Sequence, residues 1–427
     1  MFRKILYFKL KIISKLILAK YRPEIIGITG SVGKTSTKEA VYSVLVGDFN
    51  VRKNIKNYNN EIGVPLTIIG AETGGKSILR WLYLFSKAFW LLVWRDKNYP
   101  SVLVLEMGAD KPGDIDYLLS IVQCRIGILT AVSESHIEYF GSLDNIAQEK
   151  RLIISRLDKE GFAIINMDND LAWQQKAHTK SNVMSFGIKH KASAQAENIV
   201  IMERDGELGL NFKLSYQGTT IPIFLPGIIS HQHLYAVLAA VCVGIIYNIN
   251  LVDIGHKLQQ YHGVPGRTRY IPGIKGSKII DDTYNSSPLA TKAALDLMPL
   301  IPNTEAGDYY AVLGDMLELG RISEEAHLNI GKAVNDLKIN YLIAFGEKAR
   351  DIARGAIKAG MNKDYVYTFS DHHQAGLFLQ DRVKKNDIIL VKGSQGVRME
   401  RIVKEIMADP TNAEDLLVRQ TKDWENK

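Results

Sequence analysis

The stretch that decides the fold is residues 25–37, which read IIGITGSVGKTST. An apolar run, spaced glycines and a Lys-Thr pair are typical of a strand, a phosphate-binding loop and a helix start. Glycines let backbone N–H groups approach phosphate oxygens, and the helix N-terminus adds positive potential. Lys34 is expected to reach the outer phosphates and Thr35 to ligate Mg²⁺. Position 28 is isoleucine where the strict pattern has glycine, so the loop is a shortened variant. The expected nucleotide-binding residues here are Gly30, Ser31, Val32, Gly33, Lys34, Thr35 and Ser36.

Outside this loop, short apolar runs alternate with helical stretches, which favours a mostly parallel sheet with helices on both faces. Shorter runs between 206 and 226 favour antiparallel strands, and the Gly/Pro-rich run HGVPGRTRYIPG at 262–273 is the best domain boundary. The sequence therefore predicts an α/β protein with a P-loop central domain and a smaller, Rossmann-like C-terminal domain. The predicted divisions are a basic amphipathic helix at 1–22, the central domain at 23–262 and the C-terminal domain at 263–427. The expected strands are 25–28, 102–106, 126–130, 163–166, 278–281, 310–313, 341–345 and 387–391, with a helix at 234–246.

Three polar residues in the first half invite a functional interpretation. Glu106 ends an apolar strand, which would direct its carboxylate into the crevice where open α/β sheets bind ligands. The alternative is a strand-end glutamate that faces solvent. His136 follows the next strand, and a lone histidine is more often structural than a ligand. Glu106 and the phosphate-binding loop are expected at the same sheet edge, which favours a site. Lys150 lies in a helical run and, by itself, indicates a solvated helix face.

In the second half, turn residues and charged residues follow three expected strands. The runs are DDTYNSSP at 281–288, GDMLELG at 314–320 and KGS at 392–394. Each could be ordinary turn chemistry. Since the carboxyl ends of parallel strands meet at one edge, three such loops together indicate a second binding edge.

The composition narrows the class of protein. The 427 residues include 53 Lys and Arg against 46 Asp and Glu, a net charge of +7, with 46% hydrophobic residues. Such a chain is globular and long enough for two or three domains. Two cysteines exclude a disulfide framework and favour a reducing, cytoplasmic compartment. No basic stripe with interleaved aromatics accompanies the positive charge, so nucleic acid is not an expected partner. Anionic small substrates or a membrane surface are favoured instead.

Two apolar segments raise the question of a membrane. Residues 1–22 read MFRKILYFKLKIISKLILAKYR, with Lys4, Lys11, Lys15 and Arg22 on one helical line. Lysines interrupt this segment too often for a spanning helix. It is either a basic amphipathic helix on the inner leaflet or a helix packed on the next domain. The run at 81–94 is too short to span, so a buried or interfacial helix is expected, and no transmembrane segment is predicted.

Taken in order, these motifs resemble those of the Mur ligases, the ATP-dependent amide-bond enzymes of peptidoglycan precursor synthesis. The resemblance runs from about residue 24 to 401 and is strongest to the member that adds D-alanyl-D-alanine to a UDP-N-acetylmuramoyl tripeptide. The matching stretches are GITGSVGKTSTK from 27, NYNNEIGVPLT from 57, LEMGADKPGDI from 105, SHIEYFGSLDNIAQEK from 135, PGRTR from 265, IIDDTYNSSP from 279, VLGDMLELG from 312 and LVKGSQGVRME from 390.

The resemblance implies residue roles that spacing alone could not supply. Thr35 and Glu106 resemble ligands of one Mg²⁺, and His136 resembles a ligand of a second. Lys150 falls where the family has a lysine carbamylated by carbon dioxide, which replaces the solvated-face interpretation. Lys34, His136 and Lys150 are therefore the expected catalytic residues. Asp282 matches the acidic residue that meets the ribose, and Arg267 the arginine near the phosphates. The expected substrate-side residues are Asn59, Asn60, Tyr284, Asn285, His327 and Lys392.

The implied mechanism is attack of a carboxylate on the γ-phosphate of ATP, which gives an acyl phosphate that an amine then attacks. The 262–273 segment would be the hinge of a closing C-terminal domain, which excludes water. The implied protein is a cytoplasmic monomer, at the inner membrane surface if residues 1–22 bind lipid.

Two departures from the family keep alternatives open. The family has an N-terminal uridine-nucleotide domain, whereas about two dozen residues precede Ile25 here, and Ala236 stands where the family has an asparagine near the adenine. One alternative is a related ligase for a lipid-linked peptide or polyglutamate-type carboxylate. Another is a membrane-docked nucleotide-binding protein without ligase activity.

Overall fold

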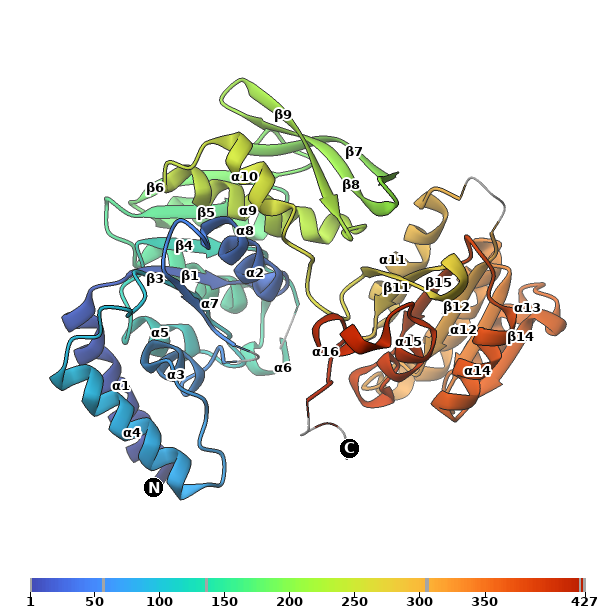
Figure 1. Ribbon diagram of the computed structural model, residues 1–427, viewed down its shortest axis with the longest axis horizontal. Coiled ribbons are helices and arrows are strands. Elements are labelled where there is room, and N and C mark those ends of the chain that lie inside the picture. Colours follow the sequence, from blue (N-terminus) through green and yellow to red (C-terminus); the bar gives the residue numbers. More distant parts are fainter. Residues whose placement is uncertain (1, 56–57, 135–136, 304–306, 422–423, 425–427) are drawn as a thin grey trace. The chain divides into compact units, whose positions relative to one another are not determined.

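The computed structural model of the protein describes residues 2–55, 58–134, 137–303, 307–421 and 424. Within them, nine strands form one sheet in the order β2-β3-β1-β4-β5-β6-β7-β8-β9 (Figure 1). Neighbouring strands from β2 to β7 pair in parallel, as predicted. The strands are β1 (Glu24–Thr29), β2 (Val51–Lys53), β3 (Val102–Glu106), β4 (Ile126–Leu129), β5 (Phe162–Asn166), β6 (Asn182–Gly187), β7 (Ala194–Arg204), β8 (Glu207–Tyr216) and β9 (Thr219–Pro226).

Two-residue turns join β7 to β8 and β8 to β9. Asp205 and Gly206 in the first turn, and Gln217 and Gly218 in the second, all have positive φ. Turns of this kind connect antiparallel neighbours, because their twist matches that of the strands. The predicted antiparallel segment after 206 is thus confirmed.

Helices cover both faces of this sheet. They are α1 (Phe2–Tyr21), α2 (Lys34–Leu45), α3 (Gly63–Ile69), α4 (Ile78–Val93), α5 (Asp114–Leu119), α6 (Ile137–Phe140), α7 (Leu143–Ser155), α8 (Asp170–Gln174), α9 (His231–Ile246) and α10 (Leu251–Leu258). Helix α7 approaches the sheet closely, because a Cβ at Gly127 of β4 would lie 2.3 Å from the carbonyl oxygen of Ile153. This close approach fixes the position of the helix that carries Lys150.

The second sheet has the order β10-β11-β15-β12-β13-β14, with only the β10–β11 pair antiparallel among its pairings. This matches the predicted Rossmann-like C-terminal domain. Its strands are β10 (Arg269–Pro272), β11 (Lys278–Asp282), β12 (Tyr309–Gly314), β13 (Tyr341–Phe345), β14 (Val366–Phe369) and β15 (Ile388–Lys392). Its helices are α11 (Pro288–Leu297), α12 (Ser323–Asp336), α13 (Arg350–Lys358), α14 (His372–Arg382), α15 (Glu400–Ile406) and α16 (Ala413–Leu416).

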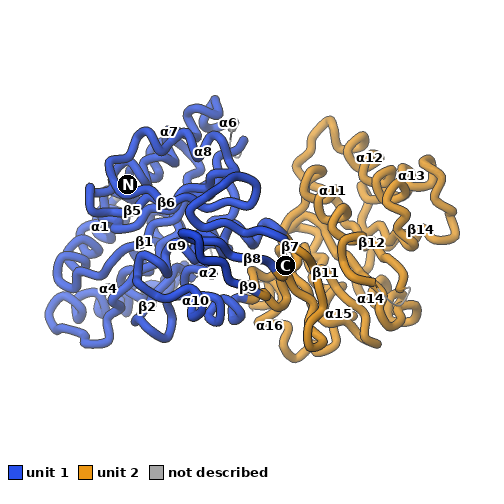
Figure 2. The backbone as a smooth tube through the Cα atoms, turned by 90° about the horizontal axis from the view of Figure 1, so that it is seen from above, with its two compact units in different colours: residues 1–199, 212–223, 231–261 blue, residues 200–211, 224–230, 262–427 orange. Residues whose placement is uncertain are grey.

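The chain divides into two units, coloured separately in Figure 2. Unit 1 comprises residues 1–199, 212–223 and 231–261, and unit 2 comprises 200–211, 224–230 and 262–427. The continuous part of unit 2 begins where the Gly/Pro-rich boundary segment was predicted. The two short segments were not predicted, and they belong to unit 2 because Leu208 and Ile229 pack into its hydrophobic core.

Helix α1 is part of unit 1 rather than a separate element. Leu10, Ser14 and Ile17 are fully buried, and α1 packs against α3 and α4. Lys11 Nζ donates to Ser120 Oγ at 2.5 Å, so the predicted line of lysines is not wholly solvated. No helix among the described residues is both long and apolar enough to cross a bilayer.

Candidate active site

The phosphate-binding loop leaves β1, which lies between β3 and β4. Ile28 is in register with Glu106, and Thr29 with Leu129. The loop, the carboxylate of Glu106 and the segment after β4 therefore emerge at one edge of the sheet, as predicted. The chain runs from β1 to β2 on one side of β1, and later from β3 to β4 on the other side, so the direction of winding changes beside β1. Open α/β sheets bind ligands at such a point.

The loop is held open by the segment that follows β4. Thr130 Oγ1 donates to the Val32 carbonyl at 2.6 Å, and Ser31 N donates to the Ala131 carbonyl at 2.7 Å. Gly30 has φ +153°, and a Cβ there would lie 2.0 Å from Thr130 Oγ1. Since only glycine fits such an approach, the backbone of this loop keeps a concave shape suited to phosphate oxygens. Lys34 Nζ donates to the Gly30 carbonyl at 2.7 Å, so the lysine side chain folds back and its ammonium group lies against the loop.

Thr35 and Glu106 form the pair expected of a magnesium site. Thr35 Oγ1 donates to Glu106 Oε1 at 3.2 Å, and Glu106 is 4% exposed. A hydroxyl and a carboxylate oxygen are hard ligands, and Mg²⁺ is usually held by one or two carboxylates plus phosphate oxygens and waters. Among the described residues, no group of three or more His, Cys, Asp or Glu is arranged so that it could hold a metal ion by itself. The residues present therefore fit an ion that shares its coordination with phosphates.

Two neighbours of Glu106 were not anticipated from the sequence. Lys38, 1% exposed, places its Nζ 3.6 Å from Glu106 Oε2. Asn54 Oδ1 accepts from the Glu106 backbone N–H at 2.6 Å. The signal for Lys38 was present, because it lies three residues after Thr35 and therefore on the same helix face. Asn54 gave no local signal, since it follows a strand from another part of the chain.

The two predicted asparagines differ in their surroundings. Asn59 Nδ2 donates to Glu106 Oε1 at 3.1 Å, so Asn59 belongs to the Thr35–Glu106 pair. Asn60 Oδ1 accepts from the backbone N–H groups of Ile62 and Gly63. The Asn60 oxygen thus serves the start of α3, and its predicted substrate contact stays a prediction.

Lys150 is buried in α7, 2% exposed. Its amine makes no hydrogen bond or ion pair with the described residues. Burial, and next the positive charge of Lys34, lower the pKa of Lys150 from 10.5 to about 8. This environment contradicts the solvated helix face that the lysine suggested by itself. His136 lies outside the described residues.

In unit 2, Asp282 and Lys392 end two neighbouring strands and are in register. Lys392 Nζ lies 2.6 Å from Asp282 Oδ2 and donates to the Asn285 carbonyl at 2.9 Å. Ser394 N donates to the Asp315 carbonyl at 3.0 Å. The three loops after β11, β12 and β15 therefore share one edge, as predicted.

Arg267 and Tyr284 also come together at this edge. The Arg267 guanidinium lies 4.1 Å from the centre of the Tyr284 ring, a cation–π contact. Arg419, which sequence analysis did not single out, donates to the carbonyls of Thr283 and Tyr284 at 2.5 and 3.2 Å. It also pairs with Glu400, which is fully buried. The C-terminal segment thus holds the turn between Asp282 and Asn285.

The environment of His327 argues against the direct substrate contact predicted for it. The residue is fully buried, its Nε2 accepts from Met316 N at 3.0 Å, and its Nδ1 lies 2.6 Å from the Ser323 carbonyl. Both ring nitrogens are therefore engaged with the backbone. His327 positions the loop after β12 from within the core.

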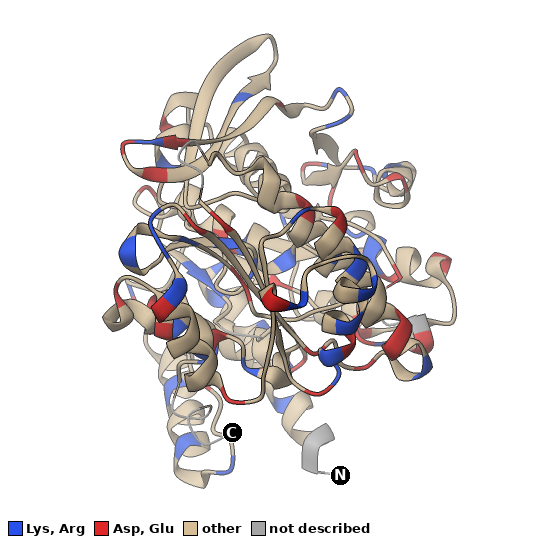
Figure 3. Cartoon of the chain, turned by 90° about the vertical axis from the view of Figure 1, so that its right-hand side faces the viewer, with Lys and Arg blue, Asp and Glu red and all other residues tan. Residues whose placement is uncertain are grey.

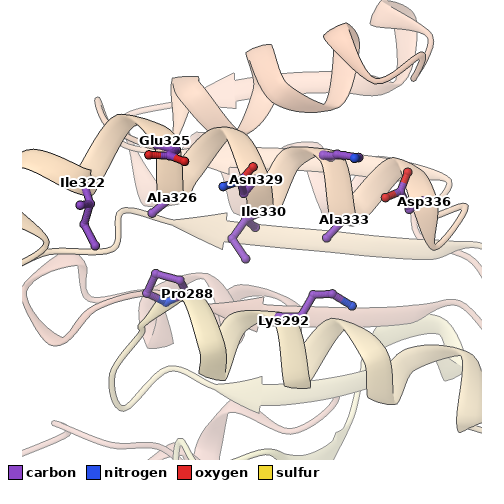
Figure 4. Close-up of a pocket in the computed structure, with 10 residues that line it drawn as sticks. Pro288, Lys292, Ile322, Glu325, Ala326, Asn329, Ile330, Ala333 and Asp336 are labelled. Atoms are coloured by element: carbon purple, nitrogen blue, oxygen red, sulfur yellow. The ribbon is translucent and has the colours of Figure 1, made fainter.

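A cavity of about 550 Å³ lies between α11 and α12 (Figure 4). Lys292 and Lys332 share its wall with Glu325 and Asp336, so neither charge sign predominates. None of the predicted site residues lines it.

Comparisons with known proteins match both halves of the chain to one family. The family profile described as the Mur ligase middle domain matches residues 28–79 and 91–244, and the Mur ligase, glutamate ligase domain matches 266–395. A UDP-N-acetylmuramoyl-tripeptide–D-alanyl-D-alanine ligase of Buchnera aphidicola subsp. Acyrthosiphon pisum is 30% identical, across 91% of this chain and 78% of that protein. The chain belongs to the Mur ligase family.

Other relatives point to the same branch of the Mur ligases. The ligase of that name from Bacillus subtilis is 29% identical, across 93% of this chain and 79% of that protein. Among solved structures, MurF from Acinetobacter baumannii has a TM-score of 0.77 at 26% identity, covering 94% of this chain and 81% of that one. MurF ligase from Thermotoga maritima in complex with ADP has a TM-score of 0.71 at 27% identity, covering 93% and 83%.

The matched segments include most of the site but leave out α1 and the middle of α4. The phosphate-binding loop, Glu106 and Lys150 fall in the middle-domain match, and Asp282, Tyr284 and Lys392 in the C-terminal match. Helix α1 and residues 80–90 of α4 lie outside both. These site residues therefore lie inside the segments that match the family, whereas α1 and the middle of α4 lie outside them.

Proposed function

We propose that this Mur ligase adds D-alanyl-D-alanine to a UDP-N-acetylmuramoyl tripeptide at the expense of ATP, in peptidoglycan precursor synthesis. The observation that carries the proposal is the Thr35–Glu106 pair beside a phosphate-binding loop, in a chain whose relatives are ligases of this name. It is an ATP-dependent enzyme that forms amide bonds.

The reaction proceeds in two steps, phosphoryl transfer and then amide formation. A carboxylate oxygen of the tripeptide attacks the γ-phosphorus, forming an O–P bond as the bond to the leaving ADP oxygen breaks. The amine of the dipeptide then attacks the acyl carbon, forming the C–N bond, and inorganic phosphate leaves as the amine gives up a proton. Phosphoryl transfer depends on positioning and charge neutralisation, and Lys34 on its loop supplies both.

Thr35 and Glu106 would hold the Mg²⁺ that accompanies ATP, and Lys38 balances the Glu106 charge before the ion arrives. The bound ion supplies neutralisation of the phosphate charge. A second Mg²⁺ would be held by His136 and by Lys150 in its carbamylated form.

Carbamylation of Lys150 fits its surroundings. The neutral amine attacks carbon dioxide, an N–C bond forms, and one proton is released to leave a carboxylate-like group. An amine with a pKa near 8 is about half neutral at pH 8, whereas an ordinary lysine is less than about 1% neutral. Burial thus favours the neutral amine that reacts, and a neighbouring divalent ion would stabilise the negatively charged product. Loss of turnover in Lys150→Ala without rescue by Lys150→Arg would support this role.

For nucleotide and substrate recognition, we assign the ribose contact to Asp282 and the phosphate contact to Arg267. Asn59, Asn60, Tyr284, Asn285 and Lys392 are proposed on the substrate side, with His327 as a positioning residue behind them. The enzyme is proposed to be a cytoplasmic monomer that touches the inner membrane surface peripherally through residues 1–22.

The test is phosphate release from ATP and Mg²⁺ with UDP-N-acetylmuramoyl tripeptide, with and without D-alanyl-D-alanine, together with mass detection of the pentapeptide product. Release that requires both substrates is expected. A Lys34→Ala variant serves as the inactive control. Absence of product with these substrates, but turnover with a lipid-linked peptide or a polyglutamate acceptor, would overturn the substrate assignment and leave the ligase chemistry in place.

A further inference from the structure

Helix α1 buries one face and leaves an apolar stripe in solvent. Its buried residues pack into the core of unit 1, whereas Ile5, Phe8, Ile12 and Leu16 are 42–63% exposed. Their spacing of three and four places them on one side of the helix. Lys9 and Lys15, also exposed, lie among them.

Helix α4 also buries one face and exposes apolar side chains on the other, and it exposes more of them than α1 does. Leu84, Ala88 and Leu91 are buried, and the opposite side exposes large apolar side chains. Leu79, Leu82, Tyr83, Phe89, Trp90 and Val93 are each 45–77% exposed. Several large apolar side chains exposed together on one side of a helix indicate a place where another apolar surface binds.

The two helices are joined to each other. They lie side by side in Figure 1 and are in contact. Lys20 Nζ, near the end of α1, donates to the carbonyls of Leu91, Leu92 and Trp94 at 2.7–2.9 Å. A cation that satisfies the last carbonyls of a helix also complements its dipole. Helices α1 and α4 therefore form one structural element, which we name the α1–α4 pair.

The charge on this pair has a single sign. The segments that contain the two helices and their flanking residues, 1–22 and 73–95, hold 11 Lys and Arg and no Asp or Glu. The remaining residues hold 42 Lys and Arg against 46 Asp and Glu, so these two segments account for the whole positive charge of the protein. In the view of Figure 3, Lys and Arg lie interspersed with Asp and Glu over much of the molecule. Basic residues beside exposed apolar and tryptophan side chains match an anionic lipid surface, with its negative headgroups above acyl chains.

We propose that the α1–α4 pair is a membrane-docking surface, with α4 as the larger inserting element, which binds anionic phospholipid without spanning the bilayer. This goes beyond the contact assigned to residues 1–22, because it places most of the inserted apolar side chains on a helix 57 residues further along. The surface carries Trp90 and Trp94, whose side chains favour the interface between headgroups and acyl chains. A second copy of the chain is a poor occupant, because its own α1–α4 pair would bring like charges together.

The experiment is flotation of the full-length protein with vesicles of phosphatidylcholine alone or with 30% phosphatidylglycerol. Binding to the anionic vesicles is expected to be at least ~10-fold stronger and to fall with added salt, since each surface cation contributes about 5-fold. Tryptophan emission should shift to shorter wavelength on binding. The variant Leu82→Gln/Phe89→Gln/Val93→Gln should lose about 10-fold or more of the binding. Phe8→Gln/Leu16→Gln should lose a smaller part.

The matched control is Val252→Gln/Leu300→Gln, which removes equally exposed apolar residues elsewhere and should bind as the unchanged protein does. Absence of anionic-vesicle binding, or equal binding by the α4 variant, would overturn the proposal. So would a dimer in solution that the α4 variant abolishes, since a second copy would then cover the surface. The ligase assay uses water-soluble substrates and needs no membrane. Failure of vesicle binding would therefore leave the proposed ligase function standing, and failure of ligation would leave the membrane-docking proposal standing.

Discussion

Thr35 Oγ1 lies 3.2 Å from Glu106 Oε1, although 71 positions separate the two residues. One belongs to the first turn of α2 and the other ends β3, and the parallel pairing of β1 with β3 brings them together. The pair joins the phosphate-binding loop to the proposed magnesium ligand, and the first two predictions below follow from its surroundings.

Removing the charge of Glu106 should abolish most turnover. Glu106→Gln keeps the shape of the side chain and its contact with Asn59, but it weakens the hold on Mg²⁺. We expect kcat/KM to fall about 10²–10³-fold, the usual size of losing one transition-state contact. The measurement is phosphate release as a function of Mg²⁺ concentration. Thr35→Val removes the hydroxyl and should lose turnover, whereas Thr35→Ser keeps the hydroxyl and serves as its control. An unchanged Mg²⁺ dependence in Glu106→Gln would refute the assignment of Glu106 as a magnesium ligand.

Lys38 should stabilise the protein chiefly when no Mg²⁺-nucleotide is bound. Lys38→Met leaves the buried Glu106 carboxylate without its nearest cation, which we expect to lower the free energy of unfolding by about 1–3 kcal/mol. Added Mg²⁺ and ATP should remove most of the difference, because the ion takes over the role. Urea denaturation with and without Mg²⁺-ATP measures this. Lys53→Met, which breaks the half-exposed pair with Glu39, should cost under about 1 kcal/mol under both conditions.

The stability conferred by Lys150 should depend on pH with a defined sign. Its folded pKa, lowered to about 8, lies below the ordinary 10.5, so between these values the unfolded state binds more protons. Stability therefore rises with pH across that window relative to a variant without the amine. In buffer depleted of carbon dioxide, Lys150→Met should be more stable at pH 7 by about 1–3 kcal/mol, and the advantage should vanish near pH 10.5. If Lys150→Met were less stable than the unchanged protein at pH 7, burial of the charged Lys150 amine would not lower the stability of the protein as we infer.

Arg419 should act on nucleotide binding through the turn that it holds. Arg419→Met removes the hydrogen bonds to Thr283 and Tyr284 and one partner of the buried Glu400, so we expect a loss of about 3 kcal/mol in stability. At a temperature where the variant is folded, KM for ATP should rise more than kcat falls. Arg354→Met, which breaks an exposed pair with Glu324, is the control and should change neither. An unaltered KM would show that the C-terminal segment is only structural.

Local sequence patterns predicted much of the site. The strand, loop and helix around Gly30 were visible because glycine spacing and apolar periodicity act within one turn of chain. Glu106, Asp282 and Lys392 were found for the same reason, since each ends a strand whose apolar run marks it.

Other residues could not be placed without the fold. Asn54 and Arg419 reach the site across long separations, 52 positions to Glu106 and 136 to Thr283, and such contacts leave no periodic trace. By its local pattern alone, Lys150 was indistinguishable from a surface lysine. The family resemblance gave it a role, and the packing of α7 against Gly127 of β4 accounts for its burial. His327 matched a family position, but only packing showed both its nitrogens bonded to the backbone.

The sequence by itself determined the alternation of strands and helices, the phosphate-binding loop and the basic, carboxylate-free character of residues 1–22. Those properties depend on backbone geometry and on side chains a few positions apart. Tertiary structure alone decided which carboxylate meets Thr35, which lysine is buried, and that α1 and α4 combine into one exposed surface. Burial and charge pairing are properties of side chains brought together from distant segments, so they exist only once the sheets and their helices have packed.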